Sequence, residues 1–200
     1  MNLLFIRHGE KAAYEGDVTA VELTAKGWRQ ADLVGQRLLT ENVRIIYSSS
    51  MTRALQTAEA INKHLNVEIE VRSELREIDM GECDTKGWDY VNSQHPYFIS
   101  EFQKHERDIP YPNGECGADV WFRSKKVLDE IIHLDLDNVA IVTHGGTIRS
   151  MICGALGIAQ EKRFFLGQPL EHCSISLIKL ENSMFFLHSL NDYTHLVSEV

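Results

Sequence analysis

The stretch that decides the fold is LLFIRHGE, at Leu3–Glu10. Its four leading apolar residues are typical of a buried strand, and a histidine followed by glycine comes directly after that strand. A second stretch of the same design, VAIVTHGG, lies far downstream at Val139–Gly146. Ligands of open α/β sheets bind outside the carboxyl ends of the strands, so we expect His8 and His144 to share one crevice. Each glycine predicts a tight turn where a ligand can approach the backbone.

Composition limits what this crevice can belong to. The chain has 200 residues, of which 44% are hydrophobic and 24% charged, which fits one globular domain over residues 1–200. A formal net charge of -9 argues against nucleic acid or an anionic membrane as a partner. The first apolar run is too short for a signal peptide and no run of about 18 apolar residues occurs, so we expect a cytoplasmic protein. The four cysteines are scattered and are predicted to be free thiols.

Predicted strands and helices alternate along the chain, which favours a layered α/β fold. Thr24 can cap a helix that runs to about Leu39, with Leu39 on its buried side. A strand follows at Val43–Tyr47, then loop and capping hydroxyls at Ser48–Ser50, and then a helix that carries Arg53 in its first turn. The next predicted strand is Val67–Val71.

The second half begins with an irregular stretch, at about residues 81–114, that is rich in aromatic residues and holds three of the four prolines. We interpret it as a small cap over the site. The remaining predicted elements are a long helix, a strand, a helix from near Gly146 and a β-hairpin at one edge of the sheet. Their expected bounds are Glu115–Leu134 and Asn138–Thr143 for the first two, and Ser174–Leu180 with Met184–Leu190 for the hairpin.

Two histidines with arginines in one crevice indicate phosphate chemistry. A neutral imidazole is a competent nucleophile at phosphorus, and His8 is the candidate. Arg7 and Arg53 could bind the anionic oxygens through charge-assisted hydrogen bonds, and His144 could stabilise the charge of the transition state. A single histidine at a strand end is more often a polar cap. The repeated histidine-glycine pair at the same strand end favours the shared site.

A leaving alkoxide needs a proton, so a site of this kind requires a carboxylic acid near the ester oxygen. Glu77 lies at the edge of the predicted cap. Spacing alone does not choose between Glu77 and three other candidates, Glu10, Glu74 and Glu82. Any one of them is more often a solvated surface charge.

These residues resemble the histidine phosphatase superfamily, in its phosphoglycerate mutase-like branch. The resemblance covers Met1 to about Leu180, and its motifs are specific in their order. They are Arg7-His8-Gly9-Glu10, Leu23-Thr24-Ala25-Lys26-Gly27 with Gln30-Ala31, Tyr47-Ser48-Ser49 with Arg53-Ala54 and Thr57-Ala58, Leu75-Arg76-Glu77 with Gly81, and Thr143-His144-Gly145-Gly146.

The resemblance implies a three-layer αβα sandwich around a mostly parallel sheet. It also implies an enzyme that needs no metal or other cofactor. It implies that His8 is the phosphorylated nucleophile and that Glu77 is the proton donor. The phosphoryl oxygens would be bound by Arg7, Arg53 and His144. Gly145, at the start of the predicted helix, is also predicted to bind the substrate.

The chain departs from the family pattern at Lys11 and Tyr14, where Thr or Gln and then Asn are common. That loop normally lines the phosphate pocket. Lys11 therefore either adds a cation to the pocket or faces solvent as a loop lysine. His172 precedes a predicted strand and is left outside the predicted site.

The predicted function is a metal-independent phosphatase that hydrolyses small phosphomonoesters through phosphohistidine. A cofactor-dependent phosphoglycerate mutase is the main alternative, but mutases of this branch tend to be longer and to carry a larger insertion over the site. A non-catalytic phosphate-binding module would need neither His8 nor Glu77. No cysteine is followed six positions later by arginine, and no P-loop motif occurs. The substrate, a small phosphorylated metabolite, and the oligomeric state stay open.

Overall fold

The computed structural model describes residues 1–13, 16–167 and 169–199. Tyr14, one of the two departures from the family pattern, lies outside the described residues. The central sheet has six strands in the described part of the chain, in the order β3-β2-β4-β1-β5-β6. Strands β1 to β4 are parallel to one another, whereas β5 is antiparallel to β1 and to β6. Their bounds are β1 Asn2–Arg7, β2 Ile45–Ser49, β3 Glu68–Arg72, β4 Asn138–Thr143, β5 Ile175–Glu181 and β6 Met184–Asp192.

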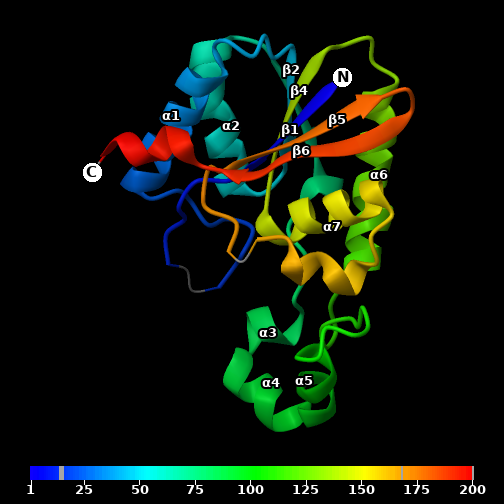
Figure 1. Cartoon of the computed structure of the whole chain (residues 1–200). Coiled ribbons are helices and arrows are strands. Elements are labelled where there is room, and N and C mark those ends of the chain that lie inside the picture. The colour runs from blue at the N-terminus through cyan, green and yellow to red at the C-terminus, as the bar shows by residue number, and fades with distance from the viewer. Residues whose placement is uncertain (14–15, 168, 200) are drawn as a thin grey trace.

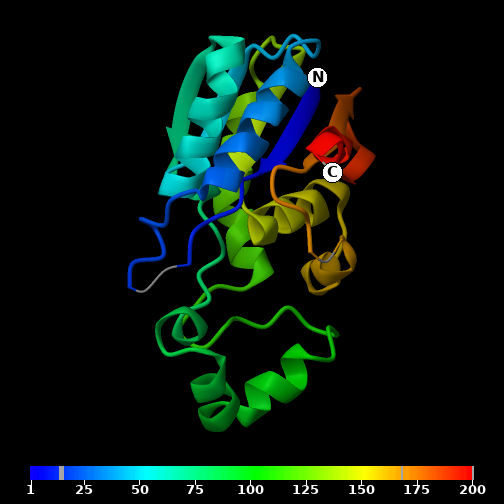
Figure 2. The same ribbon diagram turned by 90° about the vertical axis from the view of Figure 1, so that its left-hand side faces the viewer.

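Two helical layers cover the sheet, as Figures 1 and 2 show from two sides. Helices α1 (Ala25–Leu38) and α2 (Thr52–Leu65) pack on one face, and α6 (Gly117–Ile132) and α7 (Gly145–Leu156) pack on the other. The side chains of β1 alternate between the two: Leu3 and Phe5 belong to the core beneath α6 and α7, and Leu4 and Ile6 to the core beneath α1 and α2. The predicted mixed α/β fold with a mostly parallel sheet is confirmed.

Several predicted element boundaries are confirmed and others are corrected. Thr24 caps α1 by accepting a hydrogen bond from the Gly27 amide. Leu39, expected to be buried, is 57% exposed, whereas Leu38, the last residue of α1, is fully buried. Strand β2 begins and ends two residues later than predicted and includes Ser48 and Ser49, so these serines are part of the sheet. The predicted hairpin is β5 with β6, and β6 lies at the edge of the sheet.

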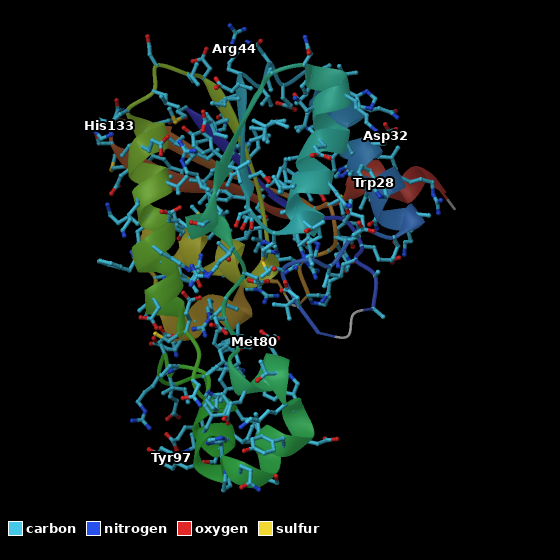
Figure 3. The ribbon with its side chains drawn as sticks, turned by 180° about the vertical axis from the view of Figure 1, so that it is seen from behind. Trp28, Asp32, Arg44, Met80, Tyr97 and His133 are labelled. Carbon is cyan, nitrogen blue, oxygen red and sulfur yellow. The ribbon has the colours of Figure 1, made fainter. Side chains whose placement is uncertain are left out.

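The stretch over the site is more regular than predicted. It contains three short helices, α3 (Glu82–Thr85), α4 (Trp88–Gln94) and α5 (Pro96–Phe102), which form a separate layer beyond the carboxyl ends of the parallel strands (Figure 1). A small apolar cluster that includes Val91 and Tyr111 holds this cap together. Figure 3 shows Met80 at the junction between the cap and the sheet layers, and Tyr97 at the far end of the cap.

Three 3₁₀ helices complete the described structure: η1 (Ser73–Leu75), η2 (Gln160–Phe165) and η3 (Thr194–Glu199). All four cysteines are free, as predicted. None of the helices in the described part of the chain has the length and apolar character that crossing a bilayer requires. The cytoplasmic location stays a prediction.

Candidate active site

His8 is the first residue after β1, and it is almost fully buried, with 3% of its surface exposed. Its Nδ1 lies 2.8 Å from the carbonyl oxygen of Gly9, and its Nε2 lies 3.2 Å from Nε of Arg53. A carbonyl oxygen only accepts and a guanidinium only donates, so the proton of the neutral ring is on Nδ1. The lone pair is therefore on Nε2, which faces Arg53.

The surroundings of His8 keep the ring neutral. Burial, and then the positive charge of Arg53, hold the pKa of His8 well below its usual value. An unprotonated imidazole with its lone pair on Nε2 is the form that can attack phosphorus. The nucleophile predicted from the sequence thus has the required protonation state at neutral pH.

Arg53 lies in the first turn of α2, where it is buried. Besides its bond to His8, its Nη1 donates to the carbonyl oxygen of Val18 over 2.8 Å. Thr57, one turn further along α2, donates to the carbonyl oxygen of Arg53 over 2.7 Å and accepts from the Gly9 amide over 3.0 Å. The turn after β1 and the start of α2 are therefore bound to each other.

Arg7, at the end of β1, points toward the loop before β5. One of its terminal nitrogens donates to the carbonyl oxygen of Leu170. Its Nε is buried and has no partner among the described residues. Gly145 lies against this side chain, because a Cβ atom at Gly145 would be 3.7 Å from Nε of Arg7. The Arg7 guanidinium thus keeps a donor available beside the start of α7.

His144, the residue before α7, has no exposed surface and lies behind His8, with 5.1 Å between the ring centroids. Its Nε2 is 2.9 Å from Oγ of Ser49, and its Nδ1 has no partner among the described residues. Burial, and then the proximity of His8, hold its pKa well below the usual value. Ser49 was expected in a loop; its contact with His144 depends on the pairing of β2 with β4 and was not predicted.

Glu77 lies in the segment between η1 and α3. Its Oε1 accepts hydrogen bonds from the amides of Ile78 (2.9 Å) and Thr147 (3.1 Å), and its Oε2 accepts a longer bond from the Gly146 amide (3.3 Å). The start of α7, which follows His144, therefore holds the Glu77 carboxyl in place. This contact joins the two halves of the predicted site.

A cavity of about 290 Å³ brings most of the predicted residues together. Arg7, His8, Arg53 and Glu77 all line it, whereas His144 lies behind His8 and Gly145 lies against Arg7. Further lining residues come from the cap and the loops around it, and they include Lys11, Arg76, Asp79, Met80 and Asp84.

Of the four candidate acids, only Glu77 lines the cavity that contains His8. Glu10 is bound to Lys26 and to the Thr24 hydroxyl, both at 2.9 Å. Glu82 is bound to Lys86 in the cap. Neither they nor Glu74 line the cavity that contains His8.

Lys11 lines the cavity, so of the two interpretations of this residue the structure favours the pocket cation. Burial, and then the charge of Arg53, lower the pKa of Lys11. Asp84 lines the same cavity, and burial raises its pKa. The wall of the cavity thus carries charges of both signs.

His172, which the sequence analysis left outside the site, lies beside it. Its ring centroid is 5.5 Å from that of His8. Burial, and then the charge of Arg7, lower its pKa to about 4. The sequence places His172 just before a predicted strand, and the pairing of that strand, β5, with β1 brings it beside His8.

The family model described as "Histidine phosphatase superfamily (branch 1)" matches residues 3–193. The chain belongs to this superfamily. It is 28% identical over 202 residues to "Phosphoserine phosphatase 1" of Hydrogenobacter thermophilus, covering 98% of this chain and 94% of the relative. It is 25% identical over 207 residues to "Probable phosphoglycerate mutase GpmB" of Yersinia enterocolitica, covering 98% and 95%. A solved phosphoserine phosphatase from Entamoeba histolytica is 26% identical, with a TM-score of 0.79 and 98% of each chain covered.

The family and these relatives confirm the predicted enzyme class. This histidine phosphatase is a phosphoric monoester hydrolase of the small-molecule type.

Proposed function

We propose that this histidine phosphatase hydrolyses small phosphomonoesters through a phosphohistidine on Nε2 of His8, with Glu77 as the general acid and then the general base. The observation that carries the proposal is that His8 and Glu77 line one cavity together with Arg7 and Arg53. A site with a nucleophile but no general acid would hydrolyse alkyl esters poorly. A module that only binds phosphate would need neither a nucleophile nor an acid.

In the first step the phosphoryl group lies between the guanidinium groups of Arg7 and Arg53, which bind its anionic oxygens. Arg53 exchanges its bond to His8 for a bond to the phosphoryl group, and this frees the Nε2 lone pair. The N–P bond forms as the ester O–P bond breaks, and His144 stabilises the charge that develops.

The departing oxygen takes a proton from Glu77. Oε1 of Glu77 already accepts two amide hydrogen bonds, whereas Oε2 accepts only the longer one. We therefore assign the transferred proton to Oε2. In the second step Glu77, now ionised, removes a proton from water, and the water oxygen attacks phosphorus to release His8 and inorganic phosphate.

The cavity wall that the leaving group of the substrate meets includes Lys11 and the acidic residues Asp79 and Asp84. Such a wall favours a leaving group that itself carries charges of both signs. Two relatives described above are named phosphoserine phosphatases, and phosphoserine has this character. We therefore propose phosphoserine as the first ester to test.

The experiment measures phosphate release from phosphoserine, 3-phosphoglycerate and p-nitrophenyl phosphate in excess EDTA. Wild type is compared with His8→Ala and with His133→Ala, a control at the end of α6 far from the cap (Figure 3). Release by wild type and by the control, but not by His8→Ala, is the expected result. Conversion of 3-phosphoglycerate without phosphate release, in the presence of 2,3-bisphosphoglycerate, would show the mutase instead.

A further inference from the structure

Arg123 and Glu115 form a buried ion pair at the base of the cap. Arg123 lies in α6 and is 8% exposed. Its Nε donates to Oε1 of Glu115 over 2.9 Å, and its Nη2 donates to Oε2 over 3.0 Å. This two-point geometry fixes the plane of both groups, which a single contact would not do.

The same guanidinium also binds the segment that carries Glu77. Its Nη2 donates to the carbonyl oxygen of Glu77 over 3.1 Å, and its Nη1 donates to the carbonyl oxygen of Glu74. Arg123 therefore holds the backbone of the proposed acid, whereas the start of α7 holds its carboxyl group.

Glu115 connects this arrangement to the cap. Its carboxylate accepts from the Asp79 amide over 3.0 Å and from Nη2 of Arg76 over 2.7 Å, and its own amide donates to the carbonyl oxygen of Asp79 over 2.8 Å. The chain enters the cap after Asp79 and leaves it at Glu115. The two crossings are thus bound to each other and to α6 through one carboxylate.

We propose that Arg123 and Glu115 are positioning residues that fix the Glu77 carboxyl opposite His8. Neither of them lines the cavity that contains His8, so they act through Glu77 and not on the substrate. This inference rests on the proposed role of Glu77 as general acid. General acid catalysis depends on distance, and a displacement of about 1 Å can cost on the order of 100-fold in rate.

The pair cannot be replaced by a simple charge. A lysine at position 123 keeps the positive charge but has no planar fork, so it cannot bind both oxygens of Glu115 and two carbonyl oxygens together. The segment that carries Glu77 then loses its fixed position while the remainder of the cavity is retained.

The test compares kcat/KM for two esters, phosphoserine with a poor alkoxide leaving group and p-nitrophenyl phosphate with a good aryl one. Because kcat/KM reports on phosphoryl transfer to His8, it is sensitive to the acid. In Arg123→Lys we expect the alkyl-to-aryl ratio of kcat/KM to fall by about 10- to 100-fold. Arg72→Lys is the matched control, because Arg72 forms a two-point pair with Glu130 on the same helix but does not bind the Glu77 segment.

A second comparison repeats the Arg123→Lys change in a Glu77→Gln background. If Arg123 acts through Glu77, the Arg123→Lys change has no further effect on the ratio in a Glu77→Gln background. An equal loss for both esters, or the same loss in both backgrounds, would overturn the inference.

A third variant separates positioning from folding. The double variant Arg123→Met/Glu115→Leu replaces the buried pair by apolar groups, which usually preserves stability. We expect its melting temperature to be near that of wild type and its alkyl-to-aryl ratio of kcat/KM still to be lowered. A wild-type ratio in this folded protein would refute the positioning role.

An unchanged alkyl-to-aryl ratio in Glu77→Gln alone would refute the role of Glu77 as the acid, and with it the role of the Arg123–Glu115 pair. A lowered ratio there with a normal one in Arg123→Lys would refute only the pair.

Discussion

Replacing Glu77 by glutamine removes the transferable proton but leaves the shape of the side chain unchanged. Oε1 keeps its bonds from the amides of Ile78 and Thr147. The amide nitrogen that replaces Oε2 loses only the 3.3 Å bond from the Gly146 amide. One hydrogen bond contributes roughly 0.5–1.5 kcal/mol to stability, so we expect a small decrease in the free energy of unfolding.

The kinetic effect of Glu77→Gln is expected to be much larger. General acid catalysis contributes about 10²- to 10⁴-fold to the rate, and each tenfold corresponds to about 1.4 kcal/mol of barrier. For an alkyl ester the loss in kcat/KM therefore exceeds what the change in stability can explain. For an aryl ester the loss is smaller, because that leaving group needs less help from an acid.

The assay measures phosphate release from phosphoserine and p-nitrophenyl phosphate by wild type and Glu77→Gln, together with the melting temperature of both proteins. For a domain of this size, about 1 kcal/mol corresponds to roughly 2–4 °C. Equal fold-losses for the two esters would refute the general-acid role of Glu77. A loss of many degrees would show instead that the carboxyl group is mainly structural.

The remaining predictions concern the phosphate site, the start of α7, pH and metal. Arg53→Lys should lower kcat/KM by about 10-fold or more for every ester, because one charge-assisted hydrogen bond contributes roughly 1.5–3 kcal/mol; an unchanged value would exclude Arg53 from phosphate binding. Gly146→Ala should reduce activity on alkyl esters far more than Gly145→Ala, because a Cβ at Gly146 would lie 2.7 Å from Oε1 of Glu77, whereas one at Gly145 meets nothing closer than 3.7 Å; steady-state kinetics of both variants test this. The pKa of His172 is lowered to about 4, so the unfolded chain takes up a proton first and stability should fall as pH drops from about 6.5 toward 4; urea denaturation should show a shallower decline in His172→Gln. Excess EDTA should leave phosphate release unchanged, and restoration by an added divalent metal would contradict the metal-free mechanism.

Local sequence patterns predicted the fold class and most of the strands and helices. The two apolar runs that end in histidine and glycine are strands β1 and β4, as predicted; that they are neighbours in the sheet is a finding of the structure. The alternation of strands and helices gave the mixed α/β class, and Thr24 marked the start of α1. Boundaries were less certain, since Ser48 and Ser49 continue β2 where a loop was expected. Hydroxyl residues suit loops by local preference, but sheet pairing outweighs that preference, since Ser48 pairs with both β3 and β4 and Ser49 pairs with β3.

What the sequence indicated by itself was a set of candidate site residues, His8, Arg7, Arg53 and His144, because short-range patterns place each of them at a strand end or a helix start. Sequence spacing left four carboxylates as candidates for the general acid, and the family resemblance implied that it is Glu77. Only the tertiary structure placed Glu77, and none of the other three, in the cavity with His8. It alone revealed Ser49 against His144, a contact between residues 95 positions apart, and Arg123 behind Glu77. Such partners depend on how the layers pack, and no periodic pattern in the sequence records which distant groups that packing brings within a hydrogen bond of each other.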